Sequence, residues 1–91
     1  MTRKFSTGKL VSTPGALAVL QAAEVDVFHL LLRHVKGDWG DLDPSDKQAN
    51  EMALENGARL LSSYDLPIGE KVWVITEADR SSTCVLLPSE Y

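Results

Sequence analysis

Apolar residues in the first half of the chain recur at the spacing of amphipathic α-helices. In "TPGALAVLQAA", a threonine that can cap a helix and a proline suited to its first turn precede an apolar stripe. This predicts a helix from Pro14 to about Ala23. Asp26 can cap a second helix that runs to about Val35, with His34 on or beside the core-facing stripe in its last turn. One continuous, kinked helix is the alternative for this region.

A third helix is predicted after the loop that begins at Gly37. Asp43 can cap this helix, Pro44 suits its first position, and the helix should end at Asn56 and Gly57. Small residues on one of its faces favour close packing on a sheet. The residues that share this face are Ala49, Met52, Ala53 and Asn56.

After Gly57 the apolar pattern takes the two-residue period of strands. The segments "ARLLSSYD", "KVWVITEA" and "STCVLLP" are separated by "LPIG" and "DRS", which are turn sequences at hairpin spacing. We therefore expect three antiparallel strands in a meander, with Lys9 to Ser12 as a candidate fourth strand. The predicted fold class is α+β, with N-terminal helices followed by a small antiparallel sheet.

Both faces of the predicted middle strand carry apolar side chains. If such a face were exposed, it would form an apolar patch that favours association with other molecules. We therefore expect the helices to cover one face, and a partner or the N-terminal segment to cover the other. The two sets of side chains are Val72, Val74 and Thr76 on one face, and Trp73, Ile75 and Glu77 on the other.

Length and charge narrow the classes of function. The 91 residues suit a single domain, 1–91, in which 1–12 form a partly disordered N-terminal segment. A net charge of −4 argues against a protein that coats nucleic acid. The N-terminus lacks the apolar region of a secretory signal, and the apolar run Val25 to Val35 contains charged residues. A cytoplasmic protein that does not enter the membrane is expected.

The stretch "HVKGDWGDLDP" combines residue types that carry chemistry. His34 lies at a helix C-terminus, where the dipole favours its protonated form, so it is a candidate acid or base. The alternative is a histidine that donates to a carbonyl of the "GDWG" loop and holds its shape. Trp39 can stack on a base or fill the core. The spacing of Asp38, Asp41 and Asp43 fits a calcium loop poorly, and no metal or cofactor is expected.

The stretch "TEADRSST" contains a second group of polar residues. Asp79 and Arg80 fall in a hairpin turn with hydroxyls on both sides, which can close the turn by hydrogen bonds to the backbone. Alternatively, Arg80 binds an anion with the nearby hydroxyls, although the glycine spacing of a P-loop is absent.

An ordered string of motifs resembles a family of small bacterial proteins labelled plasmid-related or phage-related. The motifs span Thr13 to Tyr91 and are "TPGAL", "RHVKGDWGD", Asn50, "RLLSSY", "VWVITEADRSST" and "LLPSEY". This resemblance implies an origin on a mobile element and implies no activity. The order of helices before sheet is also similar to the barnase, colicin and RelE-like ribonucleases. That likeness implies His34 as general base, Arg80 as stabiliser of the phosphorane charge, and Tyr64, Ser62 or Thr83 as phosphate-positioning residues.

Two hypotheses about function follow. The first is a non-enzymatic accessory domain that binds a protein partner or itself. Its binding residues would come from the "GDWG" loop and the sheet: Asp38, Trp39, Trp73 and Thr83. The second is a metal-independent ribonuclease, which requires His34, Tyr64 and Arg80 to meet in one open, positively charged cleft.

Overall fold

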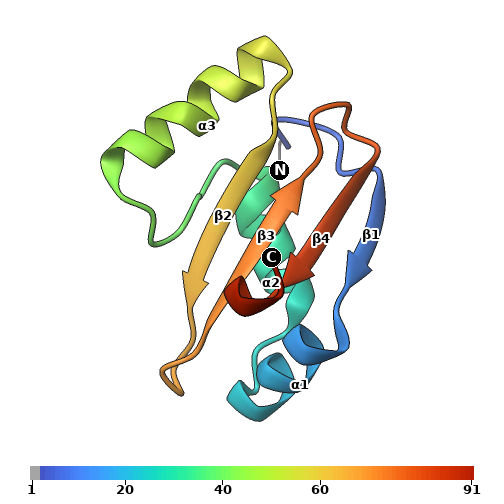
Figure 1. Cartoon of the computed structure of the whole chain (residues 1–91), viewed down its shortest axis with the longest axis vertical. Helices are drawn as coiled ribbons and strands as arrows, with labels where there is room; N and C mark the ends of the chain where they lie inside the picture. The colour runs from blue at the N-terminus through green and yellow to red at the C-terminus, as the bar shows by residue number, and fades with distance from the viewer. Residues whose placement is uncertain (1–2) are drawn as a thin grey trace.

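The computed structural model describes residues 3–91. Within this range the chain forms three α-helices, a four-stranded sheet and a short C-terminal 3-10 helix (Figure 1). The class is α+β, as predicted. The elements in chain order are β1 (Lys9–Ser12), α1 (Pro14–Ala23), α2 (Val27–Val35), α3 (Pro44–Asn56), β2 (Leu60–Asp65), β3 (Lys71–Thr76), β4 (Ser82–Leu86) and η1 (Pro88–Glu90). Met1 and Thr2, part of the predicted N-terminal segment, lie outside the described residues.

The sheet has the strand order β1-β4-β3-β2. Strands β2, β3 and β4 form the predicted antiparallel meander. The candidate fourth strand is present, but β1 runs parallel to β4, so the prediction of a purely antiparallel sheet is wrong. The reason is connectivity. A hairpin forces its two strands to be antiparallel, whereas β1 reaches β4 only through all the intervening elements, so no turn sets its direction.

Local capping signals begin all three helices where the sequence predicts. The side chains of Thr13, Asp26 and Asp43 each accept a hydrogen bond from an amide of the following helical turn, at 2.9–3.0 Å. The alternative of one continuous helix is wrong, because Glu24 takes a left-handed conformation and α1 and α2 meet at 105°. Within residues 3–91 no single helix has the length and apolarity to cross a membrane. The α1–α2 pair meets that test only as two segments with this bend between them.

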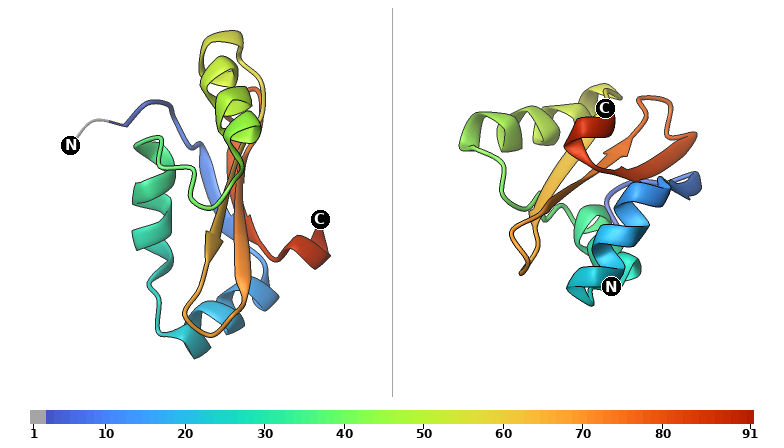
Figure 2. Two further views of the ribbon diagram at one scale, coloured as in Figure 1. Left: turned by 90° about the vertical axis from the view of Figure 1, so that its left-hand side faces the viewer. Right: turned by 60° about the horizontal axis from the view of Figure 1, so that its bottom comes forward.

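One face of the sheet packs against α1 and α2, while η1 lies on the opposite face (Figure 2). Val72, Val74 and Thr76 are buried on the side of the helices, as expected for one of the two predicted faces. Residues from both layers form the main core, including Leu20, Leu30, Tyr64, Val74 and Val85.

The opposite face is covered by the C-terminus rather than by the N-terminal segment. Trp73 is half-buried and makes an edge contact with the Tyr91 ring at 5.7 Å, while the Arg59 guanidinium lies 5.1 Å from the centre of that ring. Glu90 anchors this segment by accepting a hydrogen bond from the Thr13 hydroxyl at 2.6 Å. Ile75 is also buried. The expectation that the N-terminal segment covers this face is therefore wrong, whereas a partner at this face stays a prediction.

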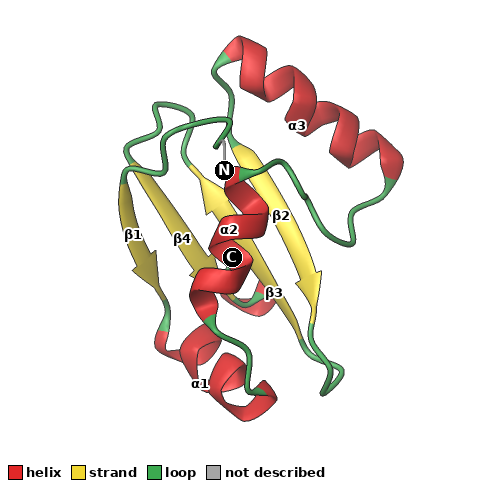
Figure 3. Ribbon diagram, turned by 180° about the vertical axis from the view of Figure 1, so that it is seen from behind, coloured by secondary structure: helices red, strands yellow, loops and turns green. Residues whose placement is uncertain are grey.

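Helix α3 lies along the β2 edge of the sheet (Figure 3). Its buried residues are Asn50 and Ala53, whereas Met52 is 53% exposed, so the face predicted for α3 is wrong apart from Ala53. The Asn50 side chain decides the rotation of the helix. Its amide donates to the Leu61 carbonyl at 2.6 Å, and its oxygen accepts from the Leu61 amide at 3.1 Å.

Candidate functional site

His34 lies fully buried between α2 and the sheet. Its Nδ1 is 2.6 Å from the Ser62 hydroxyl, and its Nε2 is 2.9 Å from the Thr76 hydroxyl. The expectation that His34 donates to a carbonyl of the "GDWG" loop is wrong. The last turn of α2 faces the sheet, so the His34 ring lies within hydrogen-bond distance of the Ser62 and Thr76 hydroxyls. Both ring nitrogens are engaged within the fold.

The hydrogen bonds of His34 continue into a buried polar chain. The Thr76 and Thr83 hydroxyls are 2.7 Å apart, and the Thr83 hydroxyl also donates to the Thr7 carbonyl at 2.8 Å. Across residues 3–91, every buried side-chain nitrogen or oxygen atom has a hydrogen-bond partner. The chain therefore joins the N-terminal segment, β4, β3 and α2 without leaving a polar atom that calls for a ligand.

The surroundings of His34 favour the neutral imidazole. Phe5 and Trp39 make edge contacts with its ring at 5.1 and 5.7 Å, and burial lowers its pKa to about 4. The expected protonation by the helix dipole is wrong, because the desolvation penalty of a buried imidazolium exceeds the stabilisation that the helix dipole provides. At neutral pH His34 is an uncharged residue of the core.

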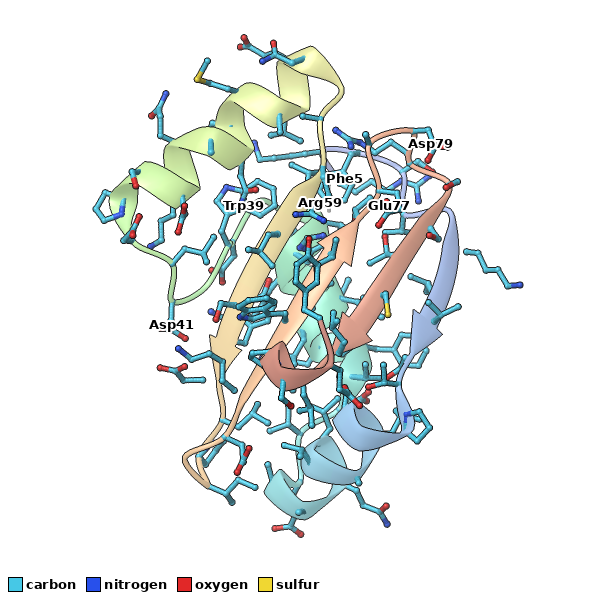
Figure 4. The ribbon with its side chains drawn as sticks, viewed as in Figure 1. Phe5, Trp39, Asp41, Arg59, Glu77 and Asp79 are labelled. Carbon is cyan, nitrogen blue, oxygen red and sulfur yellow. The ribbon has the colours of Figure 1, made fainter. Side chains whose placement is uncertain are left out.

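The "GDWG" loop closes one edge of the sheet. Trp39 is buried, and its indole N–H donates to Glu51 of α3 at 2.7 Å. The Ser63 amide donates to the Trp39 carbonyl at 3.1 Å, and the Asp41 amide donates to the Ser63 carbonyl at 2.6 Å. Figure 4 shows Trp39 and Asp41 in the loop beside β2. With Asn50, this loop satisfies the outward backbone groups of β2.

Asp38 and Tyr64 support the same loop. The Asp38 carboxylate forms an ion pair with Arg33 at 2.7 Å, and this contact holds the pKa of Asp38 below its usual value. The Tyr64 hydroxyl donates to the Asp38 carbonyl at 2.7 Å. Tyr64 is fully buried, and burial raises its pKa to about 12. Its phenol is a structural donor in this position.

Arg80 caps helix α3 in place of binding an anion. Its guanidinium donates to the carbonyls of Ala53 and Ala58 at 3.1 and 2.6 Å, and also to two carbonyls of its own turn. The Asp79 side chain accepts from the Ser81 amide at 3.0 Å, so a carboxylate closes the predicted turn in place of a hydroxyl. Figure 4 shows Glu77 and Asp79 at this hairpin. Cationic donors near a helix C-terminus hydrogen-bond its last carbonyls and interact favourably with the helix dipole.

The contacts of Arg80 give a first prediction. Arg80→Ala should lower the free energy of unfolding by about 1–3 kcal/mol, because carbonyls at the end of α3 lose a charged donor. Arg80 has φ of 61°, in the left-handed region. Arg80→Gly loses the same hydrogen bonds but removes the backbone strain, so it should lower the free energy of unfolding by less than Arg80→Ala does. Urea unfolding of both variants measures the difference. Equal stability of all three proteins would contradict the capping role.

The structure brings only some of the predicted site residues together. His34, Thr83 and Trp39 share one buried region, while Trp73 lies on the opposite face of the sheet. Arg80 lies above the Phe5 ring at 5.8 Å, but its donors are occupied by carbonyls. Within residues 3–91, His34, Tyr64 and Arg80 do not line an open cleft, and no group of three His, Cys, Asp or Glu side chains is placed to hold a metal ion.

An apolar groove lies between α2 and β1. Its main hollow has a volume of about 540 Å³ and continues towards a smaller one of about 160 Å³. The exposed fraction is 62% for Phe28, 46% for Leu10 and 44% for Leu32, which is high for side chains of this size. The main hollow is lined by Arg3, Thr7, Leu10, Phe28, Leu31, Leu32 and Val35. We call this region the α2–β1 groove.

The outer edge of β1 borders this groove. The amides of Lys9 and Thr13 donate to carbonyls on the β4 side at 3.0 Å. Because alternate residues of a strand direct their backbone groups to opposite sides, the N–H and C=O of Leu10 and Ser12 point away from β4. Within residues 3–91 no segment pairs with this edge. Apolar side chains and free backbone donors and acceptors therefore lie next to each other.

The apolar periodicity of α2 contains a signal for this groove that was not among the predictions. Phe28, Leu32 and Val35 are spaced i, i+4 and i+7, which makes a second apolar stripe on α2 beside the stripe that ends at His34. A short surface helix with two apolar stripes needs two apolar surroundings. The sheet supplies one of them.

Comparison of the chain with protein-family models, with curated proteins and with solved structures finds no match.

Proposed function

We propose that this protein is a non-catalytic interaction domain that binds a protein partner through the α2–β1 groove. The observation that carries the proposal is the juxtaposition of exposed Phe28, Leu32 and Leu10 with the outer edge of β1, which no segment of residues 3–91 pairs with. An extended segment that adds to a sheet edge gains main-chain hydrogen bonds, and an adjacent apolar groove accepts its side chains. An exposed apolar patch next to such an edge is typical of a protein-binding surface.

The inward-facing polar residues support the same proposal. The polar groups of His34, Tyr64 and Arg80 form hydrogen bonds with other groups of the same chain. The His34 imidazole is neutral and fully buried, so a substrate cannot reach it. The net charge of −4 also favours a protein partner over nucleic acid. An origin on a plasmid or phage stays a prediction, and an accessory interaction domain is compatible with it.

Photo-crosslinking tests the proposal. The photoreactive residue p-benzoylphenylalanine replaces Phe28 in one variant and Met52 in a control, and both variants are irradiated in the native host. Both positions are exposed, but Met52 lies on α3, at the opposite edge of the sheet from β1. We expect a discrete protein adduct from position 28 and none from position 52. No adduct from position 28, or the same adducts from both positions, would overturn the proposed function.

A further inference from the structure

We propose that the occupant of the α2–β1 groove is a second copy of this chain, joined through antiparallel pairing of the two β1 strands about a twofold axis. This inference rests on the proposed function and specifies its partner. In the proposed register Val11 lies opposite Val11 of the second copy, and Leu10 lies opposite Ser12. The two four-stranded sheets then form one continuous sheet.

The backbone of β1 suits this register. The groups that point outward belong to Leu10 and Ser12, and in an antiparallel pair two facing residues of this kind exchange both of their hydrogen bonds. The twofold axis repeats the exchange, so all the outward groups of both residues are satisfied in each copy. Val11, with an exposed fraction of 40%, occupies the non-hydrogen-bonded position on the axis, where side chains approach most closely.

Charge complementarity supports the same register. Lys9 lies opposite Thr13 of the second copy. The Thr13 hydroxyl donates a hydrogen bond to the Glu90 carboxylate at 2.6 Å, so this carboxylate lies near Lys9 of the other copy. Within residues 3–91 neither Lys9 nor Glu90 forms an ion pair. A lysine on an edge strand opposes pairing with arbitrary strands. Opposite the Glu90 carboxylate, Lys9 favours the proposed pairing of the two β1 strands.

The Lys9–Glu90 ion pair is not formed within one copy. Lys9 and Thr13 are four residues apart along extended chain, so about 13 Å separates the Lys9 backbone from the residue that holds Glu90. Residues opposite each other in an antiparallel pair are only about 5 Å apart, so the two-chain arrangement brings Lys9 much closer to Glu90.

The apolar residues also meet across the axis. A twofold axis perpendicular to a continuous sheet keeps both α2 helices on the same face. The exposed Phe28, Leu32 and Leu10 of one copy then face the same residues of the other, which makes the contact self-complementary. The opposite edge of the sheet is closed by Asn50 and the "GDWG" loop, so pairing stops at two copies and does not continue into a fibre.

Light scattering during size exclusion, from low-micromolar to near-millimolar concentrations, tests the inference. We expect a concentration-dependent mass that reaches twice the 10.0 kDa of one chain. Val11→Asp places two carboxylates against each other on the axis and should leave a folded monomer, because Val11 is a surface residue of the monomer. The control Met52→Asp adds the same charge on α3 and should leave the dimer intact. A monomer at every concentration, or a dimer that Val11→Asp does not weaken, would overturn the inference.

A charge reversal tests the register. Lys9→Glu should raise the dimer Kd about tenfold, because two symmetry-related attractions become repulsions. Glu90→Gln removes the charge but keeps an oxygen that accepts from the Thr13 hydroxyl, and in this background Lys9→Glu should weaken the dimer much less than it does in the native chain. Lys47→Glu on α3 is the matched control and should leave Kd unchanged. Additive losses in the double variant Lys9→Glu/Glu90→Gln would overturn this register.

The photo-crosslinking result separates failure of this inference from failure of the proposed function. A position 28 adduct with the mass of two chains supports both. An adduct with a different protein, together with a monomer in solution, overturns the second copy as occupant and leaves the interaction domain standing. No adduct from position 28 and no dimer would overturn both.

Discussion

Replacement of Gly40 by alanine is expected to lower the free energy of unfolding by roughly 3–4 kcal/mol, from left-handed strain and two lost backbone hydrogen bonds. Gly40 has φ of 77°, which L-residues adopt at a cost. A Cβ atom at this position would also overlap the Ser63 carbonyl oxygen and crowd the Tyr64 ring. The backbone must then move away from β2, and the bonds that join Trp39 and Asp41 to Ser63 are lost.

The matched control for this experiment is Gly69→Ala. Gly69 has a similar φ of 84°, but a Cβ atom there meets nothing within 4 Å. It therefore carries only the conformational cost, about 1–2 kcal/mol. Urea unfolding of both variants separates strain from crowding. Equal losses of stability would contradict the idea that close approach to β2 requires a glycine in the "GDWG" loop.

The free energy of unfolding is expected to fall by about 3 kcal/mol as the pH drops from 7 to 4, because of His34. Burial lowers the pKa of His34 from 6.5 to about 4 in the folded protein. Between these values the unfolded chain binds a proton that the folded chain excludes, so acid favours unfolding. Stability from this source is complete above about pH 6.5 and is lost progressively down to about pH 4.

Urea unfolding as a function of pH checks this expectation. His34→Gln keeps a polar side chain without a proton to bind, and should be less stable at pH 7 but lose most of the pH dependence above pH 4. His29→Gln is the control, because His29 is exposed on the same helix. The ionised Asp38 carboxylate has its pKa lowered by Arg33, so its contribution is lost at lower pH and does not mimic the effect. A stability that stays flat between pH 7 and 5 would contradict a buried, neutral His34.

The buried polar chain fixes the position of α2, which forms one wall of the α2–β1 groove. Apolar packing alone tolerates small shifts of a helix over a sheet, whereas hydrogen bonds from both ring nitrogens of His34 to Ser62 and Thr76 permit one position. These bonds fix the last turn of α2 against β2 and β3. The stripe of Phe28 and Leu32 is thereby held at a set distance from β1, which a preformed docking surface requires.

Features encoded over a few residues are predictable from the sequence. Thr13, Asp26 and Asp43 begin helices because a capping side chain acts on amides two or three residues away. The hairpins that join β2, β3 and β4 depend in the same way on short turns. His34 could be predicted to face the core for this reason, because its position on the stripe follows from helix period alone.

Contacts between distant residues decided the rest. The hydroxyl partners of His34 lie 28 and 42 residues away, and those of Asn50 and Arg80 also come from other elements. Neither period nor capping encodes such pairings, so the sequence left open whether His34 and Arg80 act on a substrate or on the fold. The sequence by itself determined the helix starts, the meander and the core position of His34, because these depend on local geometry. Only the tertiary structure decided the parallel pairing of β1, the closed edge at β2 and the open groove beside α2, because each is set by which surfaces remain to be covered once the sheet has assembled.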